Sequence, residues 1–196
     1  RYFKAAEPSD IYREVKNIPW SSYLDAQDEI CVDGFSYSTV FKNASYAALV
    51  VKDAIADWFR ETFNKRPSVN TEDPDLRINL HINENECNLS LDASGDSLHK
   101  RGYRQKTVEA PLNEALAAGM VLMTGYDGSP PFLDPMCGSA TIPIEAALIA
   151  LNVAPGLLKT RFAFMRWKDY DSRLWRRVYR EVQAEADPLW TEPKSS

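Results

Sequence analysis

The run FLDPMCGSATIPIEAALIALN, residues 132–152, constrains the fold most. Phe132 and Leu133 have the character of a short buried strand, Asp134 ends it, and apolar residues at helical spacing follow from Thr141. A strand, a tight turn and a helix in that order form the building unit of α/β folds, which bind ligands at the carboxyl ends of their strands. The sequence therefore predicts an α/β fold with a ligand site at residues 133–141.

The residues of this turn narrow the kind of ligand. Gly138, Ser139 and Ala140 are small enough for a ligand to lie against the backbone, and the amides at a helix start favour an electronegative group. The glycines of a GxGxxG dinucleotide turn and the lysine of a GxxxxGKS/T phosphate loop are both missing. A nucleoside-like cofactor is therefore predicted. Cys137 is interpreted as a small loop residue rather than a nucleophile, because no histidine lies nearby in sequence, and Glu145 as a solvated or capping carboxylate.

The first half of the chain has the clearest periodicity. A helix is predicted for residues 9–16 with Ser9 as N-cap, an edge strand for 29–41, and a helix for 44–63 with one apolar face. Residues 76–83 and 87–92 alternate apolar and polar side chains on either side of a turn, which predicts a β-hairpin with one apolar face. His81 lies on the polar side of that hairpin, which favours a solvated histidine over a ligand or base.

The later helices are predicted from weaker patterns. Pro111 is expected to open a helix with a buried stripe, and residues 174–182 to form another helix after the motif region. The expected apolar positions are Leu112, Ala115, Leu116, Met120 and Met123 in the first, and Leu174, Val178 and Val182 in the second. The tryptophans Trp167, Trp175 and Trp190 are expected to pack against parts of a catalytic domain that this chain lacks.

A basic segment stands out in an otherwise acidic protein. Residues 97–106 concentrate cationic side chains around Gly102 and Tyr103. Guanidinium and ammonium groups beside a ring that can stack fit an RNA-contacting loop, whereas on charge alone a solvated linker fits equally well. The cationic and histidine residues are His99, Lys100, Arg101, Arg104 and Lys106.

Composition excludes some classes of protein. A net charge of −5 over 196 residues argues against a protein that coats nucleic acid indiscriminately. No run approaches the roughly 20 apolar residues of a membrane span, so a soluble, cytoplasmic protein is expected. The three cysteines lie far apart without metal-ligand spacing, which predicts reduced thiols and no metal site.

The order of motifs resembles one family closely. Two regions resemble the THUMP-domain RNA guanine-N2 methyltransferases. The first resembles motif I and the adjoining helix of that family, and it reads DPMCGSAT, then IPIEAALIALNVAPGL, then FAFMRW. The second resembles the segment that leads from the THUMP domain into the methyltransferase domain, and it reads LDASGDSLHKRGYR, then APLNEALAAGM. The resemblance implies an α/β chain: the end of a ferredoxin-like subdomain at residues 1–26, an α+β THUMP module that binds RNA at 27–100, and the incomplete start of a Rossmann-like methyltransferase domain at 101–196.

The resemblance also implies functions for individual residues. S-adenosylmethionine would be the cofactor, and ribosomal RNA, methylated at guanine N2, the substrate. The residues that would bind the cofactor are Asp134, Pro135, Cys137, Gly138, Ser139 and Thr141, flanked by Pro111 and Leu112. The basic loop then becomes an RNA or domain-junction contact through His99, Lys100, Arg101, Tyr103, Arg104 and Lys106.

Two departures from the family pattern matter. The family usually has GSGT where this chain has Ala140 as the third residue, and a methyl group there is costly only if that residue needs positive φ or touches the cofactor. The family's NPPY-like tetrapeptide, which holds the target amine, is absent, because Ser129–Phe132 runs directly into the predicted strand and is interpreted as a turn. The chain is therefore expected to be a fragment that is inactive alone. Alternatives are an RNA-binding module without activity and an adenine-N6-type nucleic-acid methyltransferase.

Overall fold

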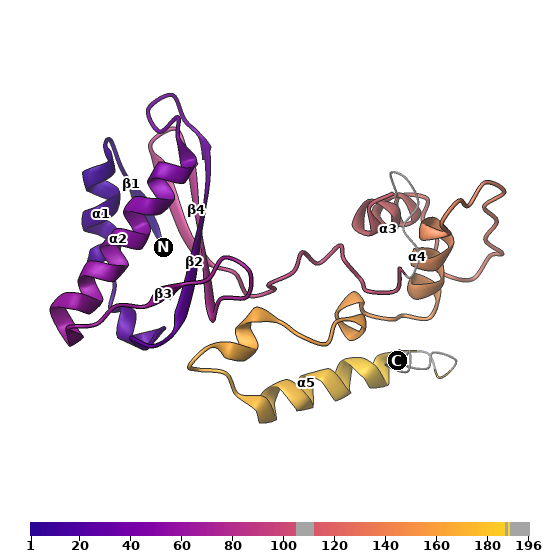
Figure 1. Cartoon of the computed structure of the whole chain (residues 1–196). Coiled ribbons are helices and arrows are strands. Elements are labelled where there is room, and N and C mark those ends of the chain that lie inside the picture. Colours follow the sequence, from indigo (N-terminus) through magenta and orange to yellow (C-terminus); the bar gives the residue numbers. More distant parts are fainter. Residues whose placement is uncertain (105–111, 187, 189–196) are drawn as a thin grey trace. The chain divides into compact units, whose positions relative to one another are not determined.

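The computed structural model describes residues 1–104, 112–186 and 188. It divides the chain into two compact units, one of residues 1–95 and 163–170, the other of residues 96–162 and the described residues from 171 onward (Figure 1). Three residues named above lie outside the described part: Lys106, Pro111 and Trp190. None of the described helices is long and apolar enough to cross a membrane.

The first unit contains one mixed five-stranded sheet of order β1-β5-β4-β2-β3. Its strands are β1 (Tyr2–Lys4), β2 (Glu29–Tyr37), β3 (Ser68–Val69), β4 (Leu76–Asn83) and β5 (Glu86–Leu91). β2 runs parallel to β3 and β4, whereas β5 is antiparallel to β4 and β1. The predicted α/β class is confirmed, and so is the hairpin, whose inward residues Ile78 and Leu80 are fully buried while His81 is exposed.

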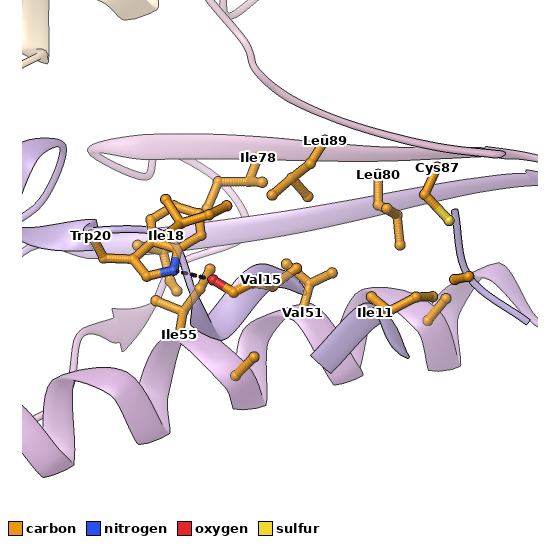
Figure 2. Close-up of a cluster of buried hydrophobic side chains, with 14 of the residues drawn as sticks. Ile11, Val15, Ile18, Trp20, Val51, Ile55, Ile78, Leu80, Cys87 and Leu89 are labelled. Atoms are coloured by element: carbon orange, nitrogen blue, oxygen red, sulfur yellow. Dashed lines mark hydrogen bonds between the residues drawn. The ribbon is translucent and has the colours of Figure 1, made fainter. Parts of the chain in front are cut away.

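Helices α1 (Pro8–Lys16) and α2 (Ala44–Phe63) cover one face of this sheet (Figure 1). The α2 bounds confirm the predicted helix, since the apolar side chains recur on the face that meets β2. Figure 2 shows the core between these helices and the sheet, where the indole Nε1 of Trp20 donates to the carbonyl oxygen of Val15 at 2.9 Å. Satisfying that donor lets a large ring lie fully buried.

Two local predictions in this unit are wrong in detail. α1 starts at Pro8 with Glu7 as N-cap, not Ser9, because a proline at the first helical position loses no hydrogen bond there. The strand predicted as an edge, β2, lies between β4 and β3, although β3 pairs only with Glu29 and Ile30. The predicted strand also ends at Tyr37, before residue 41.

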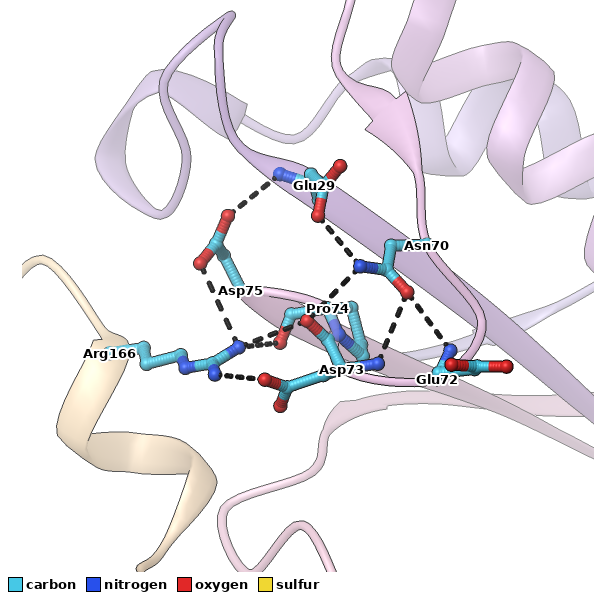
Figure 3. A network of polar contacts seen from close by, with 7 residues as sticks. All are labelled: Glu29, Asn70, Glu72, Asp73, Pro74, Asp75 and Arg166. Atoms are coloured by element: carbon cyan, nitrogen blue, oxygen red, sulfur yellow. Dashed lines mark hydrogen bonds and ion pairs between the residues drawn. The ribbon is translucent and has the colours of Figure 1, made fainter.

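Residues 163–170 return to the first unit from far along the chain. Arg166 donates to the carbonyl oxygens of Asp73 and Pro74 at 3.1 and 2.9 Å and forms an ion pair with the Asp73 carboxylate, and Figure 3 shows this together with the Asn70–Glu29 contact. Trp167 packs against the first core, so the prediction that it needs a partner outside the chain is wrong.

Two segments besides residues 27–95 belong to the first unit, namely residues 1–26 and 163–170. In the structure β1 pairs with β5, and α1 lies against α2, so residues 1–26 share the core of residues 27–95. The predicted boundaries at 26 and 100 stay predictions.

The second unit is helical in its described residues: α3 (Glu114–Met123), α4 (Thr141–Ala150) and α5 (Ser172–Glu185), with a short 3-10 turn at Pro155–Leu158. Phe132 and Leu133 form no strand, and Leu133 is 84% exposed. A strand needs neighbouring backbone groups to pair with, and the described residues of this unit offer none.

The faces of these helices differ from the predicted ones. α3 buries Glu114, Ala117 and Val121, while Leu116, Met120 and Met123 of the predicted stripe are exposed. α5 spans the predicted positions but buries none of its residues. Leu174 and Val178 therefore lie at the surface of the described structure.

Candidate cofactor loop and its supporting network

The loop of residues 134–141 turns tightly into α4. The Asp134 carboxylate accepts a hydrogen bond from the Met136 amide at 3.0 Å, and the Ala140 amide donates to the Cys137 carbonyl oxygen at 2.7 Å. Gly138 and Ala140 both have left-handed backbone conformations, with φ of 53° and 59°. Ala140 is the N-cap of α4 and has no side-chain oxygen to accept from the first-turn amides. An electronegative ligand is the kind of group that such a helix start attracts.

The predicted cofactor residues take different positions around this turn. Pro135, Cys137 and Gly138 are exposed, Asp134 and Ser139 are half-buried, and Thr141 is 3% exposed. A Cβ added at Gly138 would meet no atom within 4 Å, so the backbone there is open to a flat ligand. The small residues of the loop and the backbone amides at the start of α4 therefore fit one side of a nucleoside-like group. No described residues form a group of three or more side chains suited to a metal ion.

Glu145 on α4 is buried at 2% exposure, which overturns its interpretation as a solvated or capping carboxylate. Its Oε1 accepts from the hydroxyl of Tyr103 at 2.9 Å and lies 3.4 Å from Nε of Arg101. Arg101 also donates to the carbonyl oxygen of Leu98 at 2.7 Å. Burial, reinforced by the Glu145 carboxylate, raises the pKa of Tyr103 well above its ordinary value. The carboxylate is thus paired with a buried cation 44 residues earlier in the chain and with a hydroxyl donor 42 residues earlier.

The basic segment therefore divides into inward and outward residues. Arg101 is 8% exposed, and Arg104 donates to the Leu112 carbonyl oxygen and Thr141 Oγ1. Periodicity could not reveal these internal partners, because a basic run in a polar sequence looks the same whether it is solvated or paired. Lys100 is exposed beside Asp96, and His99 Nδ1 lies 2.7 Å from Ser97 Oγ. Contact with RNA stays a prediction, and it fits His99 and Lys100 better than the inward arginines.

The backbone at Ala140 leads to the first mutational prediction. The left-handed conformation costs a non-glycine residue about 1–2 kcal/mol, and glycine removes that cost. Glycine also raises the entropy of the unfolded chain, which lowers stability by about 0.4–1 kcal/mol. Ala140→Gly should therefore stabilise the second unit by about 0.5–1 kcal/mol. The measurement is the free energy of amide exchange for residues 141–150. The control Ala147→Gly, in the exposed interior of α4, should instead destabilise by about 1 kcal/mol. Equal destabilisation by both variants would contradict strain at residue 140.

Comparison with known proteins identifies the two parts of the chain. A THUMP domain matches residues 5–92, and an RMKL-like methyltransferase domain matches residues 101–191. A ribosomal RNA large subunit methyltransferase K/L from Aeromonas hydrophila is 42% identical over 94% of this chain and 26% of its own length.

Solved structures agree with this assignment. A predicted N6-adenine-specific DNA methylase from Listeria monocytogenes has a TM-score of 0.83 at 32% identity, over 95% of this chain and 49% of that one. A putative methyltransferase solved in complex with SAH, the demethylated product of S-adenosylmethionine, has a TM-score of 0.81 at 30% identity, over 96% and 50%. The chain thus spans between a quarter and a half of the proteins it matches. The chain contains a THUMP domain followed by residues of an RMKL-like methyltransferase domain.

Proposed function

We propose that the protein to which this chain belongs is an S-adenosylmethionine-dependent RNA methyltransferase that modifies guanine N2 in 23S ribosomal RNA. The observation that carries the proposal is the order of the two family matches, THUMP at residues 5–92 and RMKL-like methyltransferase at 101–191, with the loop 134–141 inside the second. A large-subunit ribosomal RNA methyltransferase at 42% identity supports the RNA target.

The cofactor would lie against the loop 134–141. S-adenosylmethionine supplies an already activated methyl group, so the protein's task is to bind the cofactor and hold the acceptor amine in line with it. Gly138 and Ser139 would let the backbone approach the nucleoside, and the start of α4 would face its electronegative groups. A relative that binds SAH supports this assignment. Asp134, Pro135, Cys137 and Thr141 would shape the same side of the site.

The RNA would contact the first unit and the outward basic residues His99 and Lys100. Lys106, which belongs to the same basic run of the sequence, is a further candidate. The net charge of −5 fits recognition of one site rather than general coating of nucleic acid. An enzyme of ribosomal RNA would work in the cytoplasm.

This chain would supply only part of the activity. The sequence contains no NPPY-like tetrapeptide to orient the acceptor amine, and Ser129–Phe132 forms no strand that could carry one. We therefore expect the 196-residue chain alone to transfer no methyl groups. The relatives, which are two to four times as long, would contain the residues that complete the site.

The test is to incubate the full-length parent with labelled S-adenosylmethionine and unmodified 23S ribosomal RNA, and to digest the RNA to nucleosides. Label in N2-methylguanosine is the expected result. Label in N6-methyladenosine would overturn the target in favour of the adenine alternative, which the name of the Listeria relative favours. RNA binding with no label in any nucleoside would overturn the enzyme assignment and leave an RNA-binding module, the alternative that the left-handed Ala140 favours.

A further inference from the structure

The Arg104 side chain joins three segments of the second unit. Its Nη2 donates to the Leu112 carbonyl oxygen at 2.8 Å and to Thr141 Oγ1 at 3.3 Å. The same nitrogen lies 3.3 Å from Oε1 of Glu114, in the first turn of α3, whose side chain is 8% exposed. One guanidinium therefore holds the approach to α3, the start of α3 and the start of α4 together.

The contact with Thr141 continues into the candidate loop. Thr141 Oγ1 accepts from Arg104 and lies 3.1 Å from Ser139 Oγ. Either hydroxyl can be the donor in the Ser139–Thr141 contact, because the Thr141 oxygen can accept from Arg104 in both cases. The hydroxyl of Thr141, 3% exposed, thus connects a fixed cation to a residue of the loop.

The charge of Arg104 is balanced inside this group. Glu114 supplies the opposite charge, so the guanidinium is not a buried unpaired cation. Its N–H groups can therefore donate to the neutral oxygens of Leu112 and Thr141. An RNA phosphate at this place would have to displace Glu114 and the Leu112 carbonyl oxygen. The environment of Arg104 is therefore that of an internal brace and not of an open phosphate contact.

We propose that Arg104 is a positioning residue for cofactor binding, which fixes the loop 134–141 against the stretch at Leu112 and acts through Thr141 rather than by touching the cofactor. The proposal rests on the proposed function, because it takes both stretches to flank S-adenosylmethionine. It assigns Arg104 to the cofactor site, whereas its place in a basic run predicts a contact with RNA.

The test is a double-mutant cycle in the full-length parent, read as the SAH dissociation constant by calorimetry. Arg104→Lys keeps a positive charge beside Glu114, but its compact ammonium on a flexible four-carbon stem does not reproduce the planar fork of the guanidinium. Thr141→Val keeps the shape of the side chain and removes the hydroxyl. Each single variant should raise the dissociation constant about tenfold, the size expected for a lost hydrogen bond to a charged group. The double variant should bind SAH no more weakly than the weaker single variant, because both break one connection.

A second readout separates positioning from general stability. Without any cofactor, Arg104→Lys should speed amide exchange in residues 134–141 while leaving α5 unchanged. The control Arg173→Lys, at an exposed position of α5, should change neither the SAH affinity nor the exchange of the loop.

The outcomes separate this inference from the function on which it rests. A wild-type parent that binds neither SAH nor S-adenosylmethionine would overturn the proposed function, and the inference with it. A wild-type parent that binds SAH, with Arg104→Lys binding equally well, would overturn the inference alone. Additive losses in the double variant would also overturn it, since Arg104 would then act independently of Thr141.

Discussion

Replacing Glu145 by alanine is expected to lower the free energy of unfolding of the second unit by about 3–5 kcal/mol, the cost of removing one partner of a buried ion pair. Arg101, 8% exposed, would keep its charge with no carboxylate beside it, and the Tyr103 hydroxyl would lose its acceptor. The measurement is the free energy of amide exchange for residues 141–150 in the 196-residue chain.

Two further variants make the cause of that loss testable. Glu181→Ala removes an exposed carboxylate 3.8 Å from Arg177 on α5, and should cost less than about 1 kcal/mol. The double variant Arg101→Leu/Glu145→Leu removes both charges, and should be more stable than Glu145→Ala because no unpaired cation remains buried. If Glu145→Ala and Glu181→Ala cost the same, the buried pair would have no special importance for the unit.

The first unit follows closely from its sequence, and the reason is physical. α2 and the β4–β5 hairpin each have one buried and one solvent-exposed face. Apolar side chains therefore recur about every 3.6 residues in the helix and every 2 residues in the strands, and the sequence shows both periods. The core that covers them is built within 95 residues plus one returning segment. The return of residues 163–170 to this unit could not be predicted from the sequence, because the carbonyl groups that Arg166 binds lie more than 90 residues earlier in the chain.

The second unit is harder to predict because two of its described helices, α3 and α4, lack a polar face. α3 and α4 have alanine, leucine, isoleucine or methionine on nearly every side, so spacing does not single out the buried stripe. Burial is decided by polar partners instead. Glu114 and Glu145, the residues that a polarity rule would place in solvent, are among the most buried side chains of α3 and α4.

The candidate loop shows the same division. Its residues were predictable from the strand-turn-helix order and from the resemblance, and the positive φ of Ala140 meets the condition under which the missing glycine is costly. The predicted strand before the loop does not form, since the described residues of this unit contain no strand with which it could pair. The contacts of Arg104 with Leu112, Glu114 and Thr141 could not be predicted, because a basic run does not indicate which of its cations faces inward.

Replacing Phe59 by alanine should destabilise the first unit by about 3–5 kcal/mol. Phe59 lies on α2 with 0% exposure, in the core between the helix and the sheet, and its ring meets that of Trp58 edge to face at a centroid distance of 4.9 Å. Truncation would remove the apolar contacts and leave a cavity that the neighbouring sheet cannot close. The loss is measured by urea denaturation of the 196-residue chain, followed by far-ultraviolet circular dichroism.

Phe63, one turn later on the same helix, provides the matched control. Its ring is 49% exposed, although it also contacts Phe59 and Trp58 at 5.8 and 6.0 Å. Phe63→Ala removes the same atoms but only about half as much buried area, so its cost should stay near 1–2 kcal/mol. Because both variants remove the same atoms, the difference between their costs reports mainly how deeply each ring is buried. Equal losses at the two positions would mean that α2 does not present Phe59 to the core, and the packing of α2 on the sheet would have to be revised.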